Sequence, residues 1–241
     1  MEGHFRSAGH LPKQREDGRP ASPRDDLPRQ RRGSTPQDHG RYPDYDVLEE
    51  ARHWDPVTRS TVVSRLQAPP LRFLAPEQAR TLSMFCDDVL AQDDEPRVPV
   101  LAMVDERLHE RRFDGYRYAD MPEDDETWVR VARGLDEVAG GDYAALGEQE
   151  RIAIITAFAA GELSGGVWDE LPPSRAWSVV MRYVLAAFYA HPWAWNEIGF
   201  GGPRYPRGYM RLQPDAVEPG AGAVEAFSRD PVRDTADAGP R

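Results

Sequence analysis

The sequence is poor in the residues on which several common kinds of site depend. Cys86 is its only cysteine and Lys13 its only lysine. A single cysteine excludes an intrachain disulfide and a metal cluster held by cysteines alone. Almost every positive charge is therefore an arginine, and the formal net charge is −11. Nucleic-acid binding needs a basic surface that displaces counterions, so this charge argues against a nucleic-acid partner.

Long apolar runs are also missing. No stretch of about 18 apolar residues occurs, so we expect no membrane span. Arg31-Arg32 resembles the start of a twin-arginine export signal, but the polar residues 33–38 follow in place of an apolar segment. We therefore expect the chain as numbered to remain in the cytoplasm. A periplasmic or other extracytoplasmic location would require a start further upstream or export together with a partner.

Motifs that hold nucleotides or activate nucleophiles are absent as well. No Gly-x-Gly-x-x-Gly follows a predicted strand, so we expect this chain to bind neither FAD nor NAD itself. No Gly-x-Ser-x-Gly occurs, and Cys86 lies on the apolar face of a predicted helix, which argues against a nucleophilic hydrolase. Gly165-Gly166 and Gly201-Gly202 lack the lysine of a phosphate-binding loop. We predict no catalytic residue, no bound cofactor and no metal site in this chain.

Shifts in composition predict where the folded part begins and ends. Residues 1–45 are rich in Pro, Arg, Asp, Gly and Gln and hold almost no branched aliphatic residues. Such a segment cannot bury enough apolar surface to offset the entropy lost on ordering, which predicts a disordered N-terminal tail. Residues 214–241 have the same character and are predicted to form a disordered C-terminal tail. The helical domain is then predicted over residues 46–213.

Apolar residues in this predicted domain recur with the period of a helix. Asp55-Pro56 is typical of a helix start, since a capping carboxylate precedes a proline whose missing N–H is not needed there. No alternating segment rich in β-branched residues predicts a strand. We therefore predict an all-α fold, an irregular bundle of about six helices with a long Gly/Pro/aromatic loop near the C-terminus. The predicted helices cover residues 55–66, 76–90, 99–108, 124–138, 148–160 and 174–190.

The periodicity also predicts which helix faces are buried. We expect the helix at 148–160 to bury Ile152, Ile155 and Ala159. The helix at 174–190 is apolar on nearly every side, which is typical of a central helix or of one that contacts a second protein.

Polar residues on these helices are assigned structural roles. We expect Asp105 to cap or bridge neighbouring backbone rather than to act as a base. The acidic run at residues 121–126 is interpreted as a helix N-terminus, where carboxylates are favoured. His191, in the last turn of its helix, is expected to cap free carbonyl groups. Insertion of His191 into a partner's active site is the alternative.

Residues 191–209, HPWAWNEIGFGGPRYPRGY, are the most distinctive segment. Their glycines and prolines predict a loop, yet the segment is aromatic, and Trp, Tyr and Arg are common anchors of protein interfaces. Packing on its own helices and packing on a partner are both open. We expect Glu197 to pair with Arg204 or Arg207, because an unpaired buried carboxylate is costly. The candidate partner-binding residues are His191, Pro192, Trp193, Trp195, Glu197, Phe200, Gly201, Gly202, Pro203, Tyr205, Pro206, Gly208 and Tyr209.

The same segment resembles the C-terminal signature of the gluconate 2-dehydrogenase subunit 3 family. In FYAHPWAWNEIGFGGPRYPRGY, that signature is an aromatic-His-Pro step, a Trp, a Glu-Ile-Gly, a Gly-Pro and a Pro-x-Gly-Tyr. Upstream, FLAPEQARTL, DDEPRVPV and VDERL are similar to the family pattern, so the resemblance covers about residues 70–211. Many members begin with a twin-arginine signal, which this sequence lacks.

The resemblance implies a small helical subunit that carries no cofactor and does not itself catalyse. Such a subunit pairs with a large FAD-binding oxidoreductase of the glucose–methanol–choline type, and sometimes with a cytochrome c. It implies that this chain binds and stabilises the catalytic subunit of a sugar or alcohol dehydrogenase.

Two other functions are left open by the sequence. Di-iron carboxylate proteins use Glu-x-x-His pairs on helices, and Glu50–His53 and Glu106–His109 have this spacing. Chance produces such pairs in a chain with many glutamates and six histidines, and Glu106 precedes charged residues typical of a solvated face. A helical metalloenzyme using Glu106 and His109 is the first alternative. A helical scaffold for an unrelated partner is the second.

Overall fold

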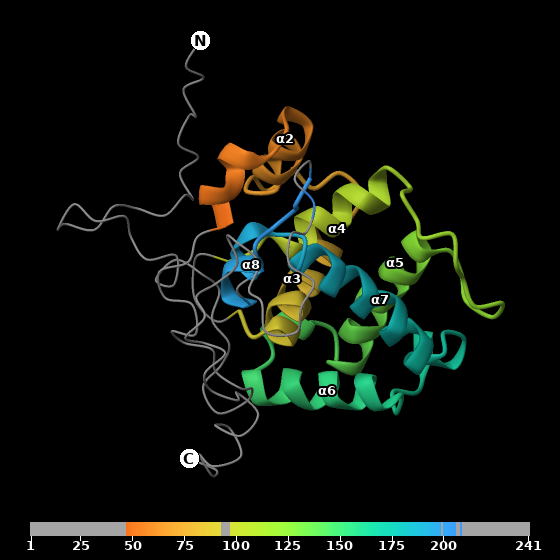
Figure 1. The fold of residues 1–241 in the computed structure, drawn as a ribbon. Helices are drawn as coiled ribbons and strands as arrows, with labels where there is room; N and C mark the ends of the chain where they lie inside the picture. Colours follow the sequence, from red (N-terminus) through yellow and green to blue (C-terminus); the bar gives the residue numbers. More distant parts are fainter. Residues whose placement is uncertain (1–46, 93–96, 199, 206–207, 209–241) are drawn as a thin grey trace, which may run out of the picture. The chain divides into compact units, whose positions relative to one another are not determined.

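The computed structural model describes residues 47–92, 97–198, 200–205 and 208 (Figure 1). Every regular element among these residues is helical, and no strand occurs among them. The predicted all-α fold class is therefore confirmed. The predicted tails, 1–45 and 214–241, lie outside the described residues. For those segments, and for one domain over 46–213, the sequence interpretation stays a prediction.

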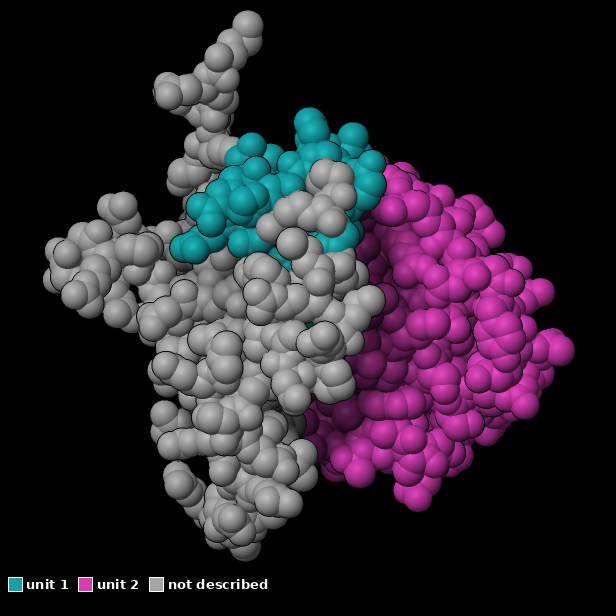
Figure 2. Space-filling view, viewed as in Figure 1, with its two compact units in different colours: residues 1–67, 92–98, 189–241 teal, residues 68–91, 99–188 magenta. Residues whose placement is uncertain are grey.

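The chain divides into two compact units, which Figure 2 colours separately. Unit 1 takes its described residues from three separate stretches of the chain, within 1–67, 92–98 and 189–241. Unit 2 consists of residues 68–91 and 99–188.

Unit 2 holds most of the helices. Within it α3 and α7 each contact α4, α5 and α6, and α5 also contacts the short helices η2 and η3. All five predicted helices of this region are present, with starts within about two residues of the prediction. The elements are α3 (Pro76–Leu90), α4 (Val100–His109), α5 (Asp124–Val138), η2 (Tyr143–Ala145), α6 (Glu148–Ala160), η3 (Gly166–Asp169) and α7 (Pro173–Phe188).

Unit 1 contains the 3-10 helix η1 (Val47–His53), α2 (Pro56–Ser64) and α8 (Pro192–Ile198). The predicted start of α2 is confirmed, because the Asp55 carboxylate accepts a hydrogen bond from the Thr58 N–H at 2.8 Å and Pro56 occupies the first turn. The helix η1 was not predicted from the sequence.

Aromatic rings fill the centre of unit 2. The Phe158 ring lies 4.9 Å from the Trp168 ring, 5.2 Å from Trp177 and 6.1 Å from Phe85, measured between centroids. Phe85 and Phe158 are fully buried. The Trp168 indole N–H donates to the Gly134 carbonyl at 3.1 Å, so the ring lies directly against the backbone of α5.

The burial prediction for α6 differs from the structure, and that for α7 stays open. On α6 it is Phe158 that is fully buried, whereas Ile152 and Ile155 are half-buried and Ala159 is exposed. The buried residue of this helix is therefore Phe158, next to the predicted Ala159. On α7, Leu185 is 42% exposed, so contact of this apolar helix with a second protein stays a prediction. The period of apolar residues locates a face only approximately when nearly all residues of a helix are apolar.

The buried carboxylate of Asp105 joins α4 to the segment that leads into α3. It accepts hydrogen bonds from three consecutive backbone N–H groups, those of Arg72, Phe73 and Leu74, at 2.6 to 3.2 Å. Asp105 has no exposed surface. The expectation that it bridges neighbouring backbone is confirmed.

Other buried polar groups of unit 2 are engaged in the same structural way. Asp88 accepts from the Arg151 guanidinium at 2.7 Å and from the Tyr143 hydroxyl at 3.1 Å. Asp124, in the first turn of α5, accepts from the Tyr183 hydroxyl at 2.6 Å. Burial raises the pKa of the Cys86 thiol, and the nearby carboxylate of Asp87 raises that pKa further. This thiol is therefore held in its protonated, unreactive form.

Replacing Asp105 by Ala should lower the free energy of unfolding by about 2–4 kcal/mol, because three backbone donors lose a charged acceptor. Denaturant unfolding followed by circular dichroism measures the change. The matched control is Glu110→Gln, an exposed carboxylate just after the same helix, which should change stability by less than about 1 kcal/mol. Equal effects for the two variants would contradict the assigned role of Asp105.

Replacing Gly134 by Ala should destabilise the fold although alanine favours a helix. The new Cβ would lie 2.7 Å from two ring carbons of Trp168, and that ring is fixed by Phe158 and by its own hydrogen bond. We expect a loss of about 1–3 kcal/mol, larger than the gain of about 1 kcal/mol in helix propensity. Thermal melting tests this, and a raised melting temperature would contradict it.

Candidate partner interface

The distinctive segment at residues 191–209 begins with a helix, which corrects the prediction of a loop throughout. The helix α7 ends at Phe188, and Pro192 occupies the first turn of α8, where its missing N–H costs nothing. The His191 ring is buried, and its Nδ1 atom accepts a hydrogen bond from the Trp193 N–H at 3.2 Å. This hydrogen bond lies at the start of α8.

Arg65 makes a capping contact of the kind that was expected of His191, for which that role stays a prediction. Its guanidinium donates to the Ala190 carbonyl at 3.0 Å and lies 5.9 Å from the centroid of the Trp195 ring. Burial lowers the pKa of Arg65 from its usual value. A cation at this position satisfies a carbonyl group just beyond the end of α7.

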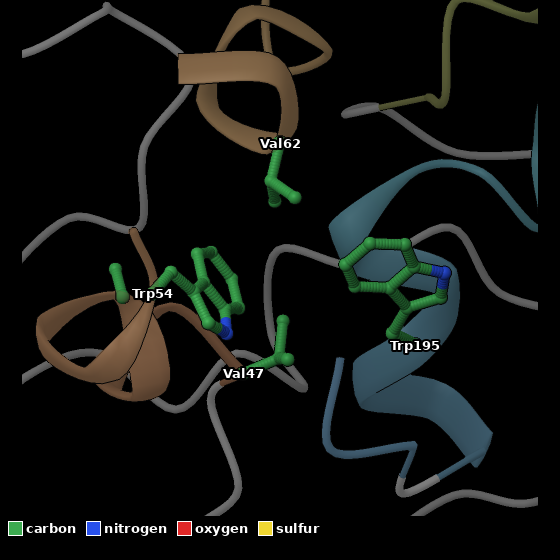
Figure 3. Packing of buried hydrophobic residues seen from close by; sticks show 5 residues of the cluster. Val47, Trp54, Val62 and Trp195 are labelled. Carbon is green, nitrogen blue, oxygen red and sulfur yellow. The ribbon is translucent and has the colours of Figure 1, made fainter. Parts of the chain in front are cut away.

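Trp195 belongs to the hydrophobic cluster of unit 1. Its side chain is 5% exposed and packs with residues of η1 and α2, as Figure 3 shows. Burial of large aromatic side chains supplies much of the stability of a small core. Trp195, which was a candidate partner-binding residue, therefore packs within the chain. The other members of this cluster are Val47, Ala51, Trp54 and Val62.

Hydrogen bonds join α8 to η1 and to the segment that precedes α8. The Val47 backbone N–H donates to the Asn196 side-chain oxygen at 2.7 Å, across 149 positions of the sequence. The Trp195 indole N–H donates to the Tyr189 carbonyl at 2.5 Å. Both donors are therefore satisfied, as buried polar groups must be.

The loop after α8 passes close to this cluster at Gly202. Its φ is +69°, and a Cβ placed there would lie 2.9 Å from side-chain carbons of Trp54 and Val47. A side chain would be strained by the backbone and would clash with the cluster. Gly201 is buried as well, and Pro203 is half-buried.

The buried guanidinium of Arg204 pairs with Glu50 at 3.3 Å, a partner that was not predicted. Glu50 lies on η1, so the pair joins the two ends of unit 1. This pair was not predicted because its members are 154 residues apart in the sequence. The sequence alone suggested only acidic residues close to Arg204 as its partners. The side chain of Glu197 and all of Arg207 lie outside what the structure describes.

The candidate residues divide into buried and exposed groups. His191, Pro192, Trp193 and Trp195 are buried, with Trp193 only 3% exposed. The exposed apolar side chains of this region are Tyr189 (46%), Ile198 (44%), Phe200 (38%) and Tyr205 (67%). We call these four residues the exposed apolar set. Gly208 is exposed, whereas Pro206 and Tyr209 lie outside the described residues.

Phe200 is supported by the buried cluster beneath it. Its ring meets the Trp195 ring edge to face, at 5.5 Å between centroids and 88° between planes. Trp195 thus contacts the core on one side and an exposed aromatic ring on the other. An exposed aromatic side chain held in this way can enter an interface at little further loss of conformational entropy.

The metal-site alternative finds no support in the geometry. Glu106 lies 3.8 Å from the Arg72 guanidinium and 3.6 Å from that of Arg112, on an exposed surface. The His53 ring accepts from Arg52 at 3.1 Å. Within the part of the chain that the structure describes, no three His, Cys, Asp or Glu residues form a group that could hold a metal ion. No helix in that part has the length and apolar character to cross a membrane.

Replacing Trp195 by Ala should lower the stability of unit 1 by about 3–5 kcal/mol, because a large side chain leaves a cavity at the centre of its cluster. Hydrogen exchange of the α2 amides and thermal melting both report this loss. Tyr205→Ala, a change at an exposed ring, should stay within about 0.5 kcal/mol of the parent. A Trp195→Ala protein with unchanged exchange and melting would show that this packing is not needed.

Comparison with known proteins adds one finding. The model of the family described as gluconate 2-dehydrogenase subunit 3 matches residues 76–202, which is more than half of the chain. The matched range includes all of unit 2 from α3 onward, and α8 with the buried tryptophans. Searches of curated proteins and of solved structures found no match.

Proposed function

The chain belongs to the gluconate 2-dehydrogenase subunit 3 family, and we propose that it is the non-catalytic small subunit of a sugar or alcohol dehydrogenase. In this role it binds and stabilises a catalytic subunit that carries FAD. The observation that carries the proposal is the family match over residues 76–202, because the family is described as a subunit of a dehydrogenase. The large partner would be a flavoprotein of the glucose–methanol–choline type, in some complexes joined by a cytochrome c.

The engagement of the buried polar groups supports a non-catalytic role. Asp105, Asp88 and Asp124 each accept hydrogen bonds that hold helices together, and Cys86 is kept protonated by burial. Active-site acids and nucleophiles are instead found in clefts, with neighbours that tune them for reaction. These residues stabilise the fold. In this proposal the function therefore depends on residues at the surface of the chain.

The exposed apolar set supplies the proposed contact with the flavoprotein. Phe200 and Tyr205 are aromatic, and aromatic residues are enriched among those that dominate interface energies. Phe200 is supported by Trp195, and Gly202 lets the loop pass close to the cluster. In this proposal the buried candidate residues shape the surface, and the exposed ones contact the partner.

The proposal predicts that the full chain, tagged and purified from its own host, brings with it a chain that shows flavin absorbance. Tyr205→Ala should weaken the affinity for that purified flavoprotein by about tenfold or more, because a large interface aromatic is lost. Titration monitored by light scattering or calorimetry measures the dissociation constant. The tagged chain alone, after separation, is expected to be colourless.

The matched control is Val57→Ala, which removes an apolar side chain that is 75% exposed on α2 of the same unit. It should leave the dissociation constant unchanged within about twofold. Wild-type chain purified without any flavoprotein would overturn the proposed function. Equal losses for Tyr205→Ala and Val57→Ala would instead move the contact away from the exposed apolar set.

A further inference from the structure

The connection between α4 and α5, from Glu110 to Glu123, is long and contains no helix or strand of its own. Connections of more than about 12 residues without regular structure are uncommon in compact domains and are usually functional. This one carries the sequence Phe113-Asp-Gly-Tyr-Arg-Tyr118, in which aromatic residues and arginine alternate around a glycine. We call residues 113–118 the tyrosine loop.

Ion pairs fix the base of the tyrosine loop. Asp114 is paired with Arg107 of α4 and, at 2.7 Å, with Arg182 of α7. Arg117 is paired with Glu123 at 2.9 Å. The loop is therefore tied to two helices of unit 2 as well as to the start of α5.

The aromatic residues of the loop differ in exposure, since Phe113 and Tyr118 are half-buried whereas Tyr116 is exposed. Tyr116 is 59% exposed, and its ring meets the Tyr118 ring edge to face at 5.4 Å. The Arg175 guanidinium lies 5.1 Å from the centroid of the Tyr118 ring and pairs with Asp120. Ordering a loop loses conformational entropy, and here little burial of Tyr116 compensates for that loss. Such a ring is pre-organised for a partner, because less entropy remains to be lost on binding.

The charges around the loop indicate what kind of partner fits it. Each arginine of this region has an acidic partner within the chain, so the loop presents little net charge to bind an acidic surface. The chain as a whole carries −11, which opposes close approach of a second copy. A tyrosine in such a setting suits an apolar pocket with a hydrogen-bond acceptor at its end. The pairs are Arg107–Asp114, Arg111–Asp125, Arg112–Glu110, Arg117–Glu123, Arg175–Asp120 and Arg182–Asp124.

We propose that the tyrosine loop is a second contact with the flavoprotein subunit, in which Tyr116 enters an apolar pocket of that protein. The inference rests on the proposed function and adds a contact carried by unit 2 to the one carried by unit 1. The energy of this contact comes from apolar burial and from the Tyr116 hydroxyl. Its affinity therefore depends weakly on salt concentration.

The test uses full-length chain and the flavoprotein purified with it, separated and mixed again. Tyr116→Ala should weaken binding by about tenfold, whereas Tyr116→Phe should lose only the part due to the hydroxyl. Val138→Ala, at a side chain that is 40% exposed on α5 of the same unit, is the matched control and should bind as the parent does. Amides of residues 113–118 should exchange hydrogen more slowly in the complex than in the free chain.

The outcomes separate this inference from the proposed function. Wild-type chain that binds the flavoprotein, together with unchanged binding of Tyr116→Ala and unchanged exchange at 113–118, would overturn the inference alone. Absence of any flavoprotein from the wild-type preparation would overturn both. A dimer of the free chain that Tyr116→Ala dissociates would make a second copy the occupant, and would also overturn the inference.

Discussion

The packing of Trp195 against Trp54 and Val47 is the contact on which unit 1 depends. It brings together η1 and α8, which lie near opposite ends of the described chain. Without it, α2 and α8 are short helices of nine and seven residues, too short to be stable in water by themselves. The Asn196–Val47 hydrogen bond, the Arg204–Glu50 pair and the close approach of Gly202 all presuppose this packing.

Unit 2 is held by a different kind of contact. Its helices are long enough to bury an aromatic core, and buried carboxylates then fix the segments between them. Asp105 orders the entry to α3, and Asp124 joins the start of α5 to Tyr183 of α7. Burial raises the pKa of Tyr183, and the hydrogen bond to Asp124 raises it further, so the hydroxyl remains a donor. A carboxylate that accepts several donors stabilises a fold without being available for reaction.

Local signals of the sequence predicted most of the fold. Prolines and capping carboxylates located the starts of α2, α3 and α5, and the bridging role of Asp105 followed from its place on an apolar helix. The helix α8 was missed because Pro192 was interpreted only as an end. The Arg204–Glu50 pair and the Trp195–Trp54 packing were missed for another reason. Their members are more than one hundred residues apart, and no local pattern encodes such a pairing.

Unit 1 is formed from stretches that lie far apart in the sequence, and this affects how it folds during synthesis. A ribosome releases residues 47–66 long before residues 189–204, so η1 and α2 must wait for α8 while unit 2 emerges and folds. During that interval Trp54 and Val62 lack their neighbour Trp195 and present apolar surface to solvent. Nascent chains halted before residue 191 would keep that surface exposed, which makes them natural substrates for chaperones and proteases.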